Sequence, residues 1–200
     1  MKKILSAVAV TVISLVLSGC ASPLMRDAST QQISPSNPGR VKVVFMRSSM
    51  VAGAIGCDVF EVINGELRFV GQLPTGNKIV YETTPGEKIF MTYGTAADFM
   101  PANLAGGKTY YSIVRPNWGT GGFAPTPIRG SSSIGPDLKS KDFKDWLSGT
   151  KLIEPNESAP AWFAENKERL QKTYTEYWSR FERKNSQEKA ERTMMPQDGQ

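Results

Sequence analysis

Seven residues, Val41-Lys42-Val43-Val44-Phe45-Met46-Arg47, decide how the central part of this chain folds. Successive side chains of a β-strand point to opposite faces of the sheet. As a strand, the stretch directs Val43 and Phe45 to one face and Val44 and Met46 to the other. A run that is apolar on both faces indicates an inner strand rather than an edge strand.

Five similar runs of β-branched and aromatic residues follow at near-regular spacing, with turn residues between them. They cover residues 57–63, 66–73, 78–84, 88–94 and 108–115, whereas 98–104 is too short to assign. Asn64-Gly65 joins two of the runs and is typical of a type I′ hairpin turn, which needs positive φ at both central residues. Six regularly spaced strands favour a sandwich or a barrel. We therefore expect a mainly β fold, an antiparallel β-sandwich over residues 40–136.

An amphipathic helix is predicted near the C-terminal end of a helical region that covers residues 137–184. Ser158 is suited to cap this helix, and Pro160 is tolerated in its first turn. At 100° per residue, five apolar side chains fall within an arc of about 100°. They are Leu170, Tyr174, Tyr177, Trp178 and Phe181. We expect this stripe to pack on the sandwich; the alternative is a partner or membrane surface, which Tyr177 and Trp178 would contact.

The rest of the C-terminal third carries weaker patterns. Phe143, Trp146 and Leu147 have helical spacing within residues 139–148, and residues 150–154 favour a further strand. After Phe181 the apolar stripe stops, so residues 185–200 are expected to be disordered.

A Gly-, Pro- and Ser-rich segment, residues 116–136, separates the strands from the helices. It contains Trp118, Phe123 and Arg129. One interpretation is a mobile binding loop in which these three residues are partner contacts. The favoured interpretation is a cover for the edge of the sandwich, with Trp118 and Phe123 folded back onto the core.

The N-terminal residues 1–19 predict a signal peptide. Lys2 and Lys3 precede an apolar run over residues 4–17, which is shorter than the roughly 20 residues of a membrane-spanning helix. Leu17-Ser18-Gly19-Cys20 resembles the lipobox of bacterial lipoproteins. The resemblance implies cleavage between Gly19 and Cys20 and two or three acyl chains on the new N-terminus, enough for stable membrane attachment. Ala21, in place of Asp, favours the outer membrane, on its periplasmic face, over the inner membrane.

The segment that follows the lipobox, residues 20–39, is rich in Ser, Pro, Asn and Gln and poor in apolar residues. Such a composition does not bury enough surface to offset the entropy of ordering. We expect a flexible tether that spans roughly 20 to 25 Å between the lipid and the folded domain.

The charge of the chain argues for a mixed, solvated surface. Without Lys2 and Lys3 it has 22 basic and 19 acidic residues, a net charge of +3, and the two signs are interspersed. Export argues against nucleic acid as a partner. The partners that this charge pattern leaves open are another envelope protein and an anionic glycolipid.

Histidine is absent, and the chain has only two cysteines. This excludes a Ser-His-Asp or Cys-His catalytic unit and any His-containing metal site within the chain. With Cys20 acylated, Cys57 has no disulfide partner and is expected to be buried. Asp58 and Glu61 are an odd number of residues apart, so they should lie on opposite faces of a strand. We expect no catalytic residue, no metal and no cofactor.

Four elements resemble a family of bacterial lipoproteins of unknown function. They are V-x-F-x-R at 43–47, G-x-L-P at 71–74, P-G-x-x-x-F at 85–90 and A-x-L-x-x-G-K-T-Y-Y at 102–111. The resemblance covers residues 41–116. It implies a β-sandwich of prealbumin-like type and carries no assigned catalytic residues.

Together these patterns predict a lipid-anchored envelope lipoprotein that acts as a non-enzymatic binding or structural module. The alternative is a ligand-binding or hydrolytic domain that uses residues 116–136 as a lid. That alternative requires two convergent carboxylates, or a lysine beside a serine, in a pocket under the segment.

Overall fold

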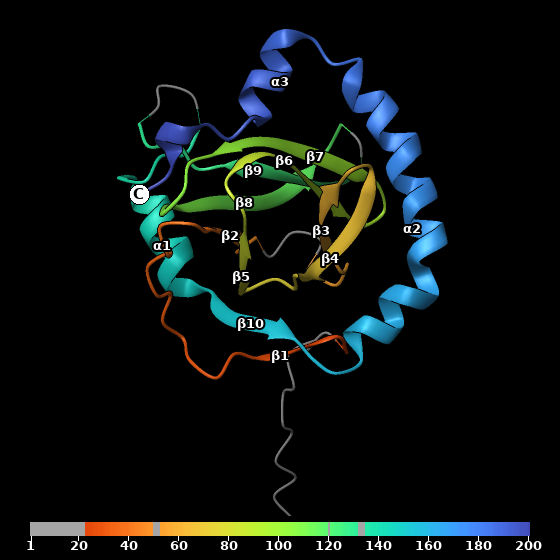
Figure 1. Ribbon diagram of the computed structural model, residues 1–200, viewed down its shortest axis with the longest axis horizontal. Helices are drawn as coiled ribbons and strands as arrows, with labels where there is room; N and C mark the ends of the chain where they lie inside the picture. The colour runs from red at the N-terminus through yellow and green to blue at the C-terminus, as the bar shows by residue number, and fades with distance from the viewer. Residues whose placement is uncertain (1–22, 50–52, 120, 132–134) are drawn as a thin grey trace, which may run out of the picture.

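The computed structural model describes residues 23–49, 53–119, 121–131 and 135–200, whose strands form two packed sheets (Figure 1). The larger sheet has the strand order β1-β10-β5-β2-β8-β9 and the smaller has β4-β3-β6-β7. The strands are β1 (Met25–Asp27), β2 (Val41–Arg47), β3 (Asp58–Ile63), β4 (Glu66–Gln72), β5 (Asn77–Thr83), β6 (Gly86–Tyr93), β7 (Ala97–Leu104), β8 (Thr109–Asn117), β9 (Gly122–Pro127) and β10 (Lys151–Pro155). The helices are α1 (Lys141–Gly149), α2 (Ala159–Glu182) and α3 (Ser186–Arg192), followed by a 3-10 turn at Pro196–Asp198. The predicted signal peptide and the Gly19-Cys20 junction lie outside the described residues.

The predicted mainly β sandwich followed by a C-terminal helix is confirmed. Every strand pair of the smaller sheet is antiparallel. The larger sheet also contains two parallel pairs, β2 with β8 and β10 with β5, which the expectation of an antiparallel sandwich did not include.

The elements stack in four layers, with a helix outside each sheet. One apolar cluster lies between the sheets and includes Phe45, Phe90 and Tyr110. A second cluster joins the outer face of the smaller sheet to α2, and a third joins the outer face of the larger sheet to α1. In Figure 1, α2 curves along the outside of the smaller sheet while α1 lies on the other side of the molecule.

Strand β2 shows why the layers form. Val43 and Phe45 belong to the cluster between the sheets, and Val44 and Met46 belong to the cluster under α1. All four side chains are fully buried. The inner position predicted for this strand is confirmed, since β2 lies between β5 and β8.

The β3–β4 hairpin has the predicted turn. Asn64 has φ 52° and Gly65 has φ 80°, the left-handed values that a type I′ turn requires at both central positions. An asparagine tolerates this region better than most residues, and glycine adopts it without strain.

Strand β3 separates two carboxylates as predicted. The Glu61 side chain faces the interior between the sheets and accepts hydrogen bonds from Tyr81 Oη at 2.6 Å and Thr83 Oγ1 at 2.9 Å. Asp58 faces the other side and accepts a hydrogen bond from Gln72 Nε2 at 2.8 Å. Just before the strand, Cys57 is fully buried as predicted, and burial raises the pKa of its thiol.

The apolar stripe of α2 packs on the smaller sheet, as expected. Leu170 is fully buried and Phe181 nearly so. Trp178 is partly buried and meets Phe99 of β7 edge-on, with ring centroids 5.0 Å apart. Burial of a leucine or phenylalanine side chain stabilises a fold by roughly 1.5 to 3 kcal/mol, so these contacts hold the helix in place. Ser158 precedes the helix without a side-chain cap hydrogen bond.

The prediction of a tether over residues 20–39 is wrong for the part that the structure describes. β1 pairs antiparallel with β10, and Leu24 and Met25 are buried. The Gln31 side chain bonds both the N–H and the carbonyl of Leu152, at 2.7 and 3.0 Å, and so extends the edge of the sheet. Few apolar residues are needed here because an unpaired strand edge supplies hydrogen bonds.

The prediction that residues 185–200 are disordered is also wrong. Asn185 and Glu188 form a capping box that starts α3, with bonds of 2.9 Å in both directions. Met194 is fully buried and exchanges backbone hydrogen bonds of 2.8 Å with Pro101 and Asn103 of β7. The last residue, Gln200, exchanges backbone hydrogen bonds with Thr109. Residues that ended the stripe of α2 thus begin a new helix.

Two strands contain prolines that weakened their sequence signal. β9 pairs with β8 along the whole of residues 122–127, so part of the predicted 116–136 loop is strand. β7, which was left unassigned, pairs with β6. Both lie at the edge of their sheets, where proline is tolerated because one side of the strand needs no ladder bond.

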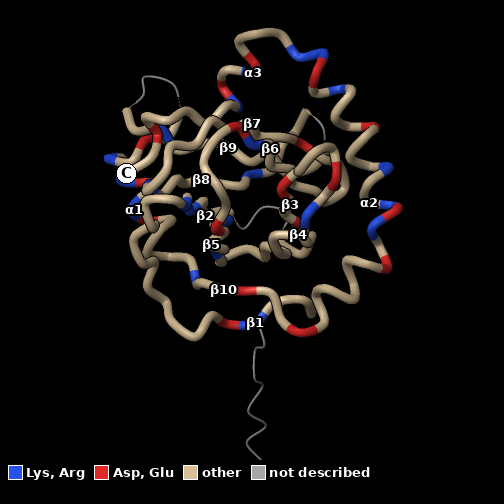
Figure 2. Tube along the Cα trace, viewed as in Figure 1, with Lys and Arg blue, Asp and Glu red and all other residues tan. Residues whose placement is uncertain are grey.

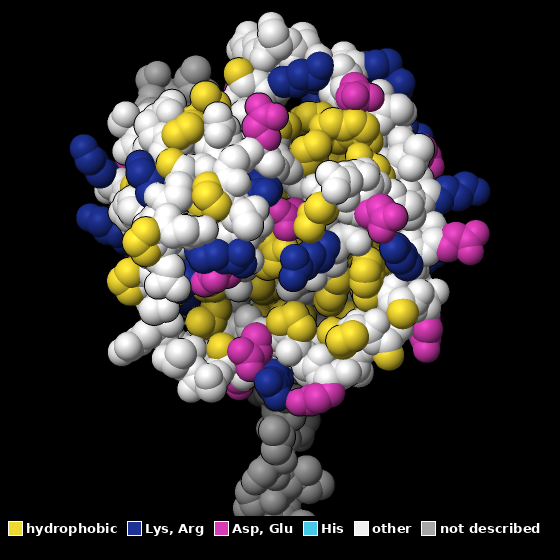
Figure 3. Space-filling model, viewed as in Figure 1, with side chains coloured by type: hydrophobic (Ala, Val, Ile, Leu, Met, Phe, Trp, Pro, Cys, Tyr) yellow, Lys and Arg dark blue, Asp and Glu magenta, His cyan; other side chains and the backbone are white. Residues whose placement is uncertain are grey.

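The surface of the described residues mixes both signs of charge. Figure 2 shows basic and acidic residues following one another along α2. On the face shown in Figure 3, apolar side chains gather beside this helix. Val62, Ile89 and Trp178 line a hollow of about 380 Å³ between α2 and the smaller sheet. Within the described ranges, no helix is both long and apolar enough to cross a membrane.

The Asp58 carboxyl predicts a pH-dependent stability. Burial raises its pKa to about 6, although the Gln72 hydrogen bond and Arg169 act in the opposite direction. Because an unfolded aspartate titrates near pH 4, the stabilisation from the bound proton is complete below about pH 4 and is lost as the pH rises through 6. Asp58→Asn should therefore gain about 2 to 3 kcal/mol in free energy of unfolding relative to the native chain between pH 4 and pH 7.5.

Urea unfolding at both pH values measures this gain, with Asp145→Asn on the exposed face of α1 as the control. An equal difference between the Asp58 variant and the native chain at the two pH values would contradict the prediction.

Candidate functional site

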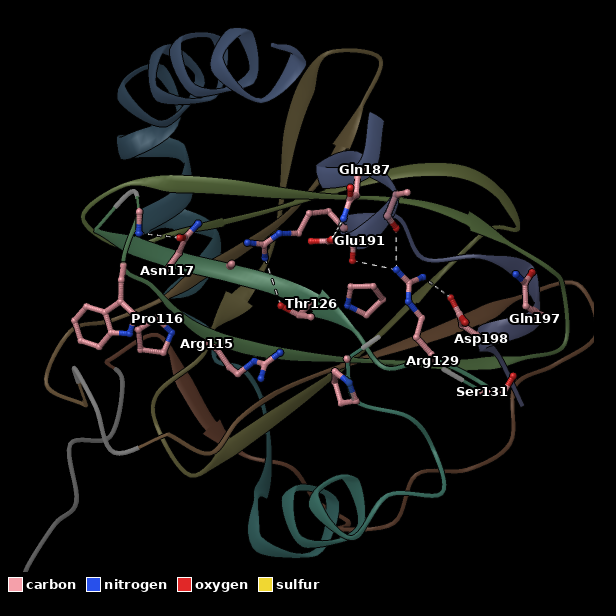
Figure 4. Close-up of a pocket in the computed structure, with 18 residues that line it drawn as sticks. Arg115, Pro116, Asn117, Thr126, Arg129, Ser131, Gln187, Glu191, Gln197 and Asp198 are labelled. Carbon is pink, nitrogen blue, oxygen red and sulfur yellow. Dashed lines mark hydrogen bonds and ion pairs between the residues drawn. The ribbon is translucent and has the colours of Figure 1, made fainter. Parts of the chain in front are cut away.

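A pocket of about 900 Å³ opens where β8 and β9 meet α3 and the C-terminal segment (Figure 4). Its size is in the range of small-molecule sites, about 300 to 1,000 Å³. The basic side chains that line it are Arg115, Arg129 and Arg192, and the acidic ones are Glu191 and Asp198. Pro116, Pro127 and Pro136 supply rigid apolar wall.

Arg115 owes its position to the alternation of β8. Tyr111 and Ile113 are buried under α1 on the outer face of the larger sheet, and Arg115 is the next residue in that row. It lies opposite Ala124 of β9 and is exposed. Its guanidinium forms no hydrogen bond or ion pair with any residue that the structure describes. Partial burial lowers the pKa of Arg115, as does the nearby Arg192, while Asp142 of α1 raises it.

Arg129 follows β9 and holds the C-terminal segment. Its guanidinium donates to the carbonyls of Ala190, Glu191 and Thr193 at the end of α3. The same guanidinium pairs with Asp198 Oδ2 at 2.9 Å. The carbonyls at a helix C-terminus lack intrahelical donors and carry the negative end of the helix dipole, so an arginine fork suits them.

The Asp198 carboxylate is fully engaged. Besides Arg129, it accepts the backbone N–H of Met195 at 2.8 Å and that of Gly130 at 3.2 Å. Glu191 accepts one bond, from Gln187 Nε2 at 3.2 Å. The two carboxylates of the pocket are thus held by different partners.

Arg192 is held more loosely than Arg129. Its guanidinium lies 3.5 Å from Asp98 Oδ2 and 3.4 Å from Thr126 Oγ1. Asp98 is also bound by Asn117 Nδ2 at 2.8 Å. Since good N–H···O bonds are closer to 2.9 Å, Arg192 keeps donors that a ligand could use.

The predicted partner residues have different fates. Trp118, at the tip of the β8–β9 hairpin, lines the pocket and is 82% exposed, so the favoured prediction that it folds back onto the core is wrong. For Phe123 that prediction is confirmed, because its ring is buried against Arg47, whose guanidinium carbon lies 4.1 Å from the ring centroid. Arg129 lines the pocket, whereas Tyr177 and Trp178 lie on α2 against the smaller sheet.

Three residues of the pocket were missed from the sequence. The period-2 pattern of residues 108–115 could have placed Arg115 beside Tyr111 and Ile113. The Asn185 to Glu188 spacing, a capping-box signature, could have indicated a helix that carries Arg192 and precedes Asp198. No local pattern indicates that this helix returns to β9.

The pocket offers guanidinium groups to a ligand. Among its described lining residues, no lysine lies beside a serine. Nowhere in the described ranges do three or more His, Cys, Asp or Glu side chains gather as a metal would need. Arginine matches the geometry of carboxylate and phosphate oxygens through paired N–H donors.

No protein-family model matches the chain, and no curated protein matches it. The resemblance to bacterial lipoproteins therefore stays a prediction.

The Arg129 fork predicts how the pocket wall is held. Arg129→Ala removes the guanidinium donors to the Ala190, Glu191 and Thr193 carbonyls and leaves Asp198 without its cation, so residues 183–193 should loosen from β9. Limited trypsin digestion should then cut at Arg183, Lys184, Lys189 and Arg192 at least about tenfold faster, since local opening exposes these sites.

Arg115→Ala, which removes the same charge from the same pocket, is the control and should digest like the native chain. Equal digestion of both variants would show that Arg129 does not hold the wall.

Proposed function

We propose that this chain is a lipid-anchored envelope lipoprotein, attached through Cys20 on the periplasmic face of the outer membrane, that binds a ligand without catalysis. The lipobox at residues 17–20 supports the anchor. The observation that carries the binding function is the 900 Å³ pocket with Arg115 and Trp118 at its opening. Exposed tryptophan and arginine are enriched at binding sites because both combine apolar area with hydrogen-bond donors.

The position of the pocket fits such an anchor. In Figure 1, β1 lies at one end of the molecule and α3 at the other. The described chain begins at residue 23 beside β1, whereas α3 forms part of the pocket wall. A protein tethered through its N-terminus would thus hold the pocket on the side away from its own membrane, open to the periplasm.

The hydrolytic alternative requires two convergent carboxylates, and of the two that line the pocket Asp198 is held within the fold while Glu191 accepts a bond from Gln187. The state of Asp198 favours the binding role. The Asp198 carboxylate accepts three hydrogen bonds from within the fold, from Arg129, Gly130 and Met195. A hydrolase of the predicted kind needs a carboxylate free to exchange a proton with the substrate.

The anchor is tested by metabolic labelling with palmitate in a bacterial host. The native chain should incorporate the label, and its N-terminal peptide should carry the acyl mass on Cys20. Cys20→Ser should lose both. Cys57→Ala is the matched control, because it removes the only other thiol and should keep the label. Equal labelling of the Cys20 variant and the native chain would overturn the anchor.

The binding surface is tested by a photo-reactive side chain at position 118, installed in cells. Adducts are expected from this position. The control is the same group at Ile63, an exposed apolar residue at the end of β3 in the other sheet. Adducts no more abundant from 118 than from 63 would count against the pocket as the binding site.

A further inference from the structure

The pocket contains one arginine that the fold leaves to a ligand. Arg129 is committed to three carbonyls and a carboxylate. Arg115, on the opposite wall, has no hydrogen-bond or ion-pair partner among the described residues. An arginine carries five N–H donors in a planar fork, and here this fork is exposed at the mouth of a cavity.

A second cation stands beside it. Arg192 lies close enough to disfavour the charge on Arg115, and its own bonds to Asp98 and Thr126 are long. Arg115 and Arg192 both line this pocket, so the two guanidinium groups border one space. An oxyanion between them would reduce their mutual repulsion and supply acceptors to both.

The acidic groups near this space are already used. Asp98 accepts bonds from Asn117 Nδ2 and from the Phe99 N–H, and it faces Arg192. Asp142 of α1 partly offsets the charge of Arg115 without forming an ion pair with it. Glu191 also lines the pocket, and it accepts a hydrogen bond from Gln187. The selection of an anion therefore rests on free donors rather than on a large net charge.

The neighbouring surface contains apolar rings. The Trp118 ring is 82% exposed, and Pro116 lines the same end of the pocket. Indole faces attract planar and ring-shaped groups, and an ordered proline costs little entropy on binding. A ligand that bridges both features would combine an oxyanion with a ring.

We propose that the pocket binds a soluble ligand that carries a phosphate or carboxylate group on a ring, with Arg115 and Arg192 holding the oxyanion and Trp118 covering the ring. This assignment deepens the proposed binding function, on which it rests, by naming the ligand chemistry. The ligand is soluble rather than a headgroup of the anchoring leaflet, because α3, which lines the pocket, lies at the end of the molecule opposite β1.

Ligand-observed NMR titration of the purified full chain in neutral detergent tests the proposal with phenyl phosphate, benzoate and inorganic phosphate. Phenyl phosphate should bind more tightly than inorganic phosphate. Arg115→Ala should weaken its binding at least about tenfold, the size expected for charge-assisted hydrogen bonds. Trp118→Ala should remove the advantage of phenyl phosphate over inorganic phosphate.

Arg68→Ala is the matched control, because Arg68 is also an exposed strand arginine but lies on β4 of the other sheet. The affinity of the Arg68 variant for phenyl phosphate should stay within about twofold of that of the native chain. The melting temperatures of the Arg68 and Arg115 variants should match that of the native chain, as for most surface changes. Binding of phenyl phosphate to the Arg115 variant with native affinity would overturn the proposal, as would the failure of all three oxyanions to bind the native chain.

Vesicles that contain phosphatidylglycerol distinguish a soluble phosphate ligand from a phosphate in a lipid headgroup. They should not displace phenyl phosphate at equal phosphate concentration, and displacement that depends on Arg115 would overturn the soluble source. If no oxyanion binds while cross-links from position 118 persist, the ligand chemistry fails and the binding module stands. If both fail, the binding function fails with it.

Discussion

Each sheet of this protein is apolar on both faces, and this constraint organises the rest of the structure. Phe45 and Phe90 meet between the sheets with ring centroids 5.3 Å apart, while Val44 and Phe99 face outward from the two sheets. Outward apolar rows are stable only when another element covers them. The helices α1 and α2 therefore follow from the strands, and their own stripes of aromatic residues match the rows that they cover.

The candidate site lies where one of these covers stops. On β8 the outward row runs from Tyr111 and Ile113 under α1 to Arg115 beyond it. Beside Arg115 the C-terminal segment, and not α1, forms the neighbouring wall. Arg129 holds this wall by donating hydrogen bonds to backbone carbonyls at the end of α3. A pocket lined by an arginine that has no partner among the described residues thus results from the same alternation that builds the core, continued by one step of the row past the cover.

The sequence predicted the parts whose signals are local. The run from Val41, the Asn64-Gly65 turn and the stripe around Leu170 each specify an element and the face that it buries. β1, β7 and β9 were missed because they are short or contain prolines, and their pairing depends on an edge supplied by a distant part of the chain. The same reason applies to the site: Arg115 and Arg192 are 77 positions apart in sequence, and only tertiary packing brings them to one pocket.

The central claim is that both ends of the described chain belong to the folded body and that the C-terminal end forms the wall of the pocket. Hydrogen exchange measured by mass spectrometry tests it most directly. Peptides that cover residues 23–31 and 186–200 should be protected, because the amides of Ala28, Met194 and Gln200 donate to backbone carbonyls of β10, β7 and β8. Exchange of both segments at the rate of an unstructured peptide, beside a protected sandwich, would contradict the claim and leave the pocket without its wall.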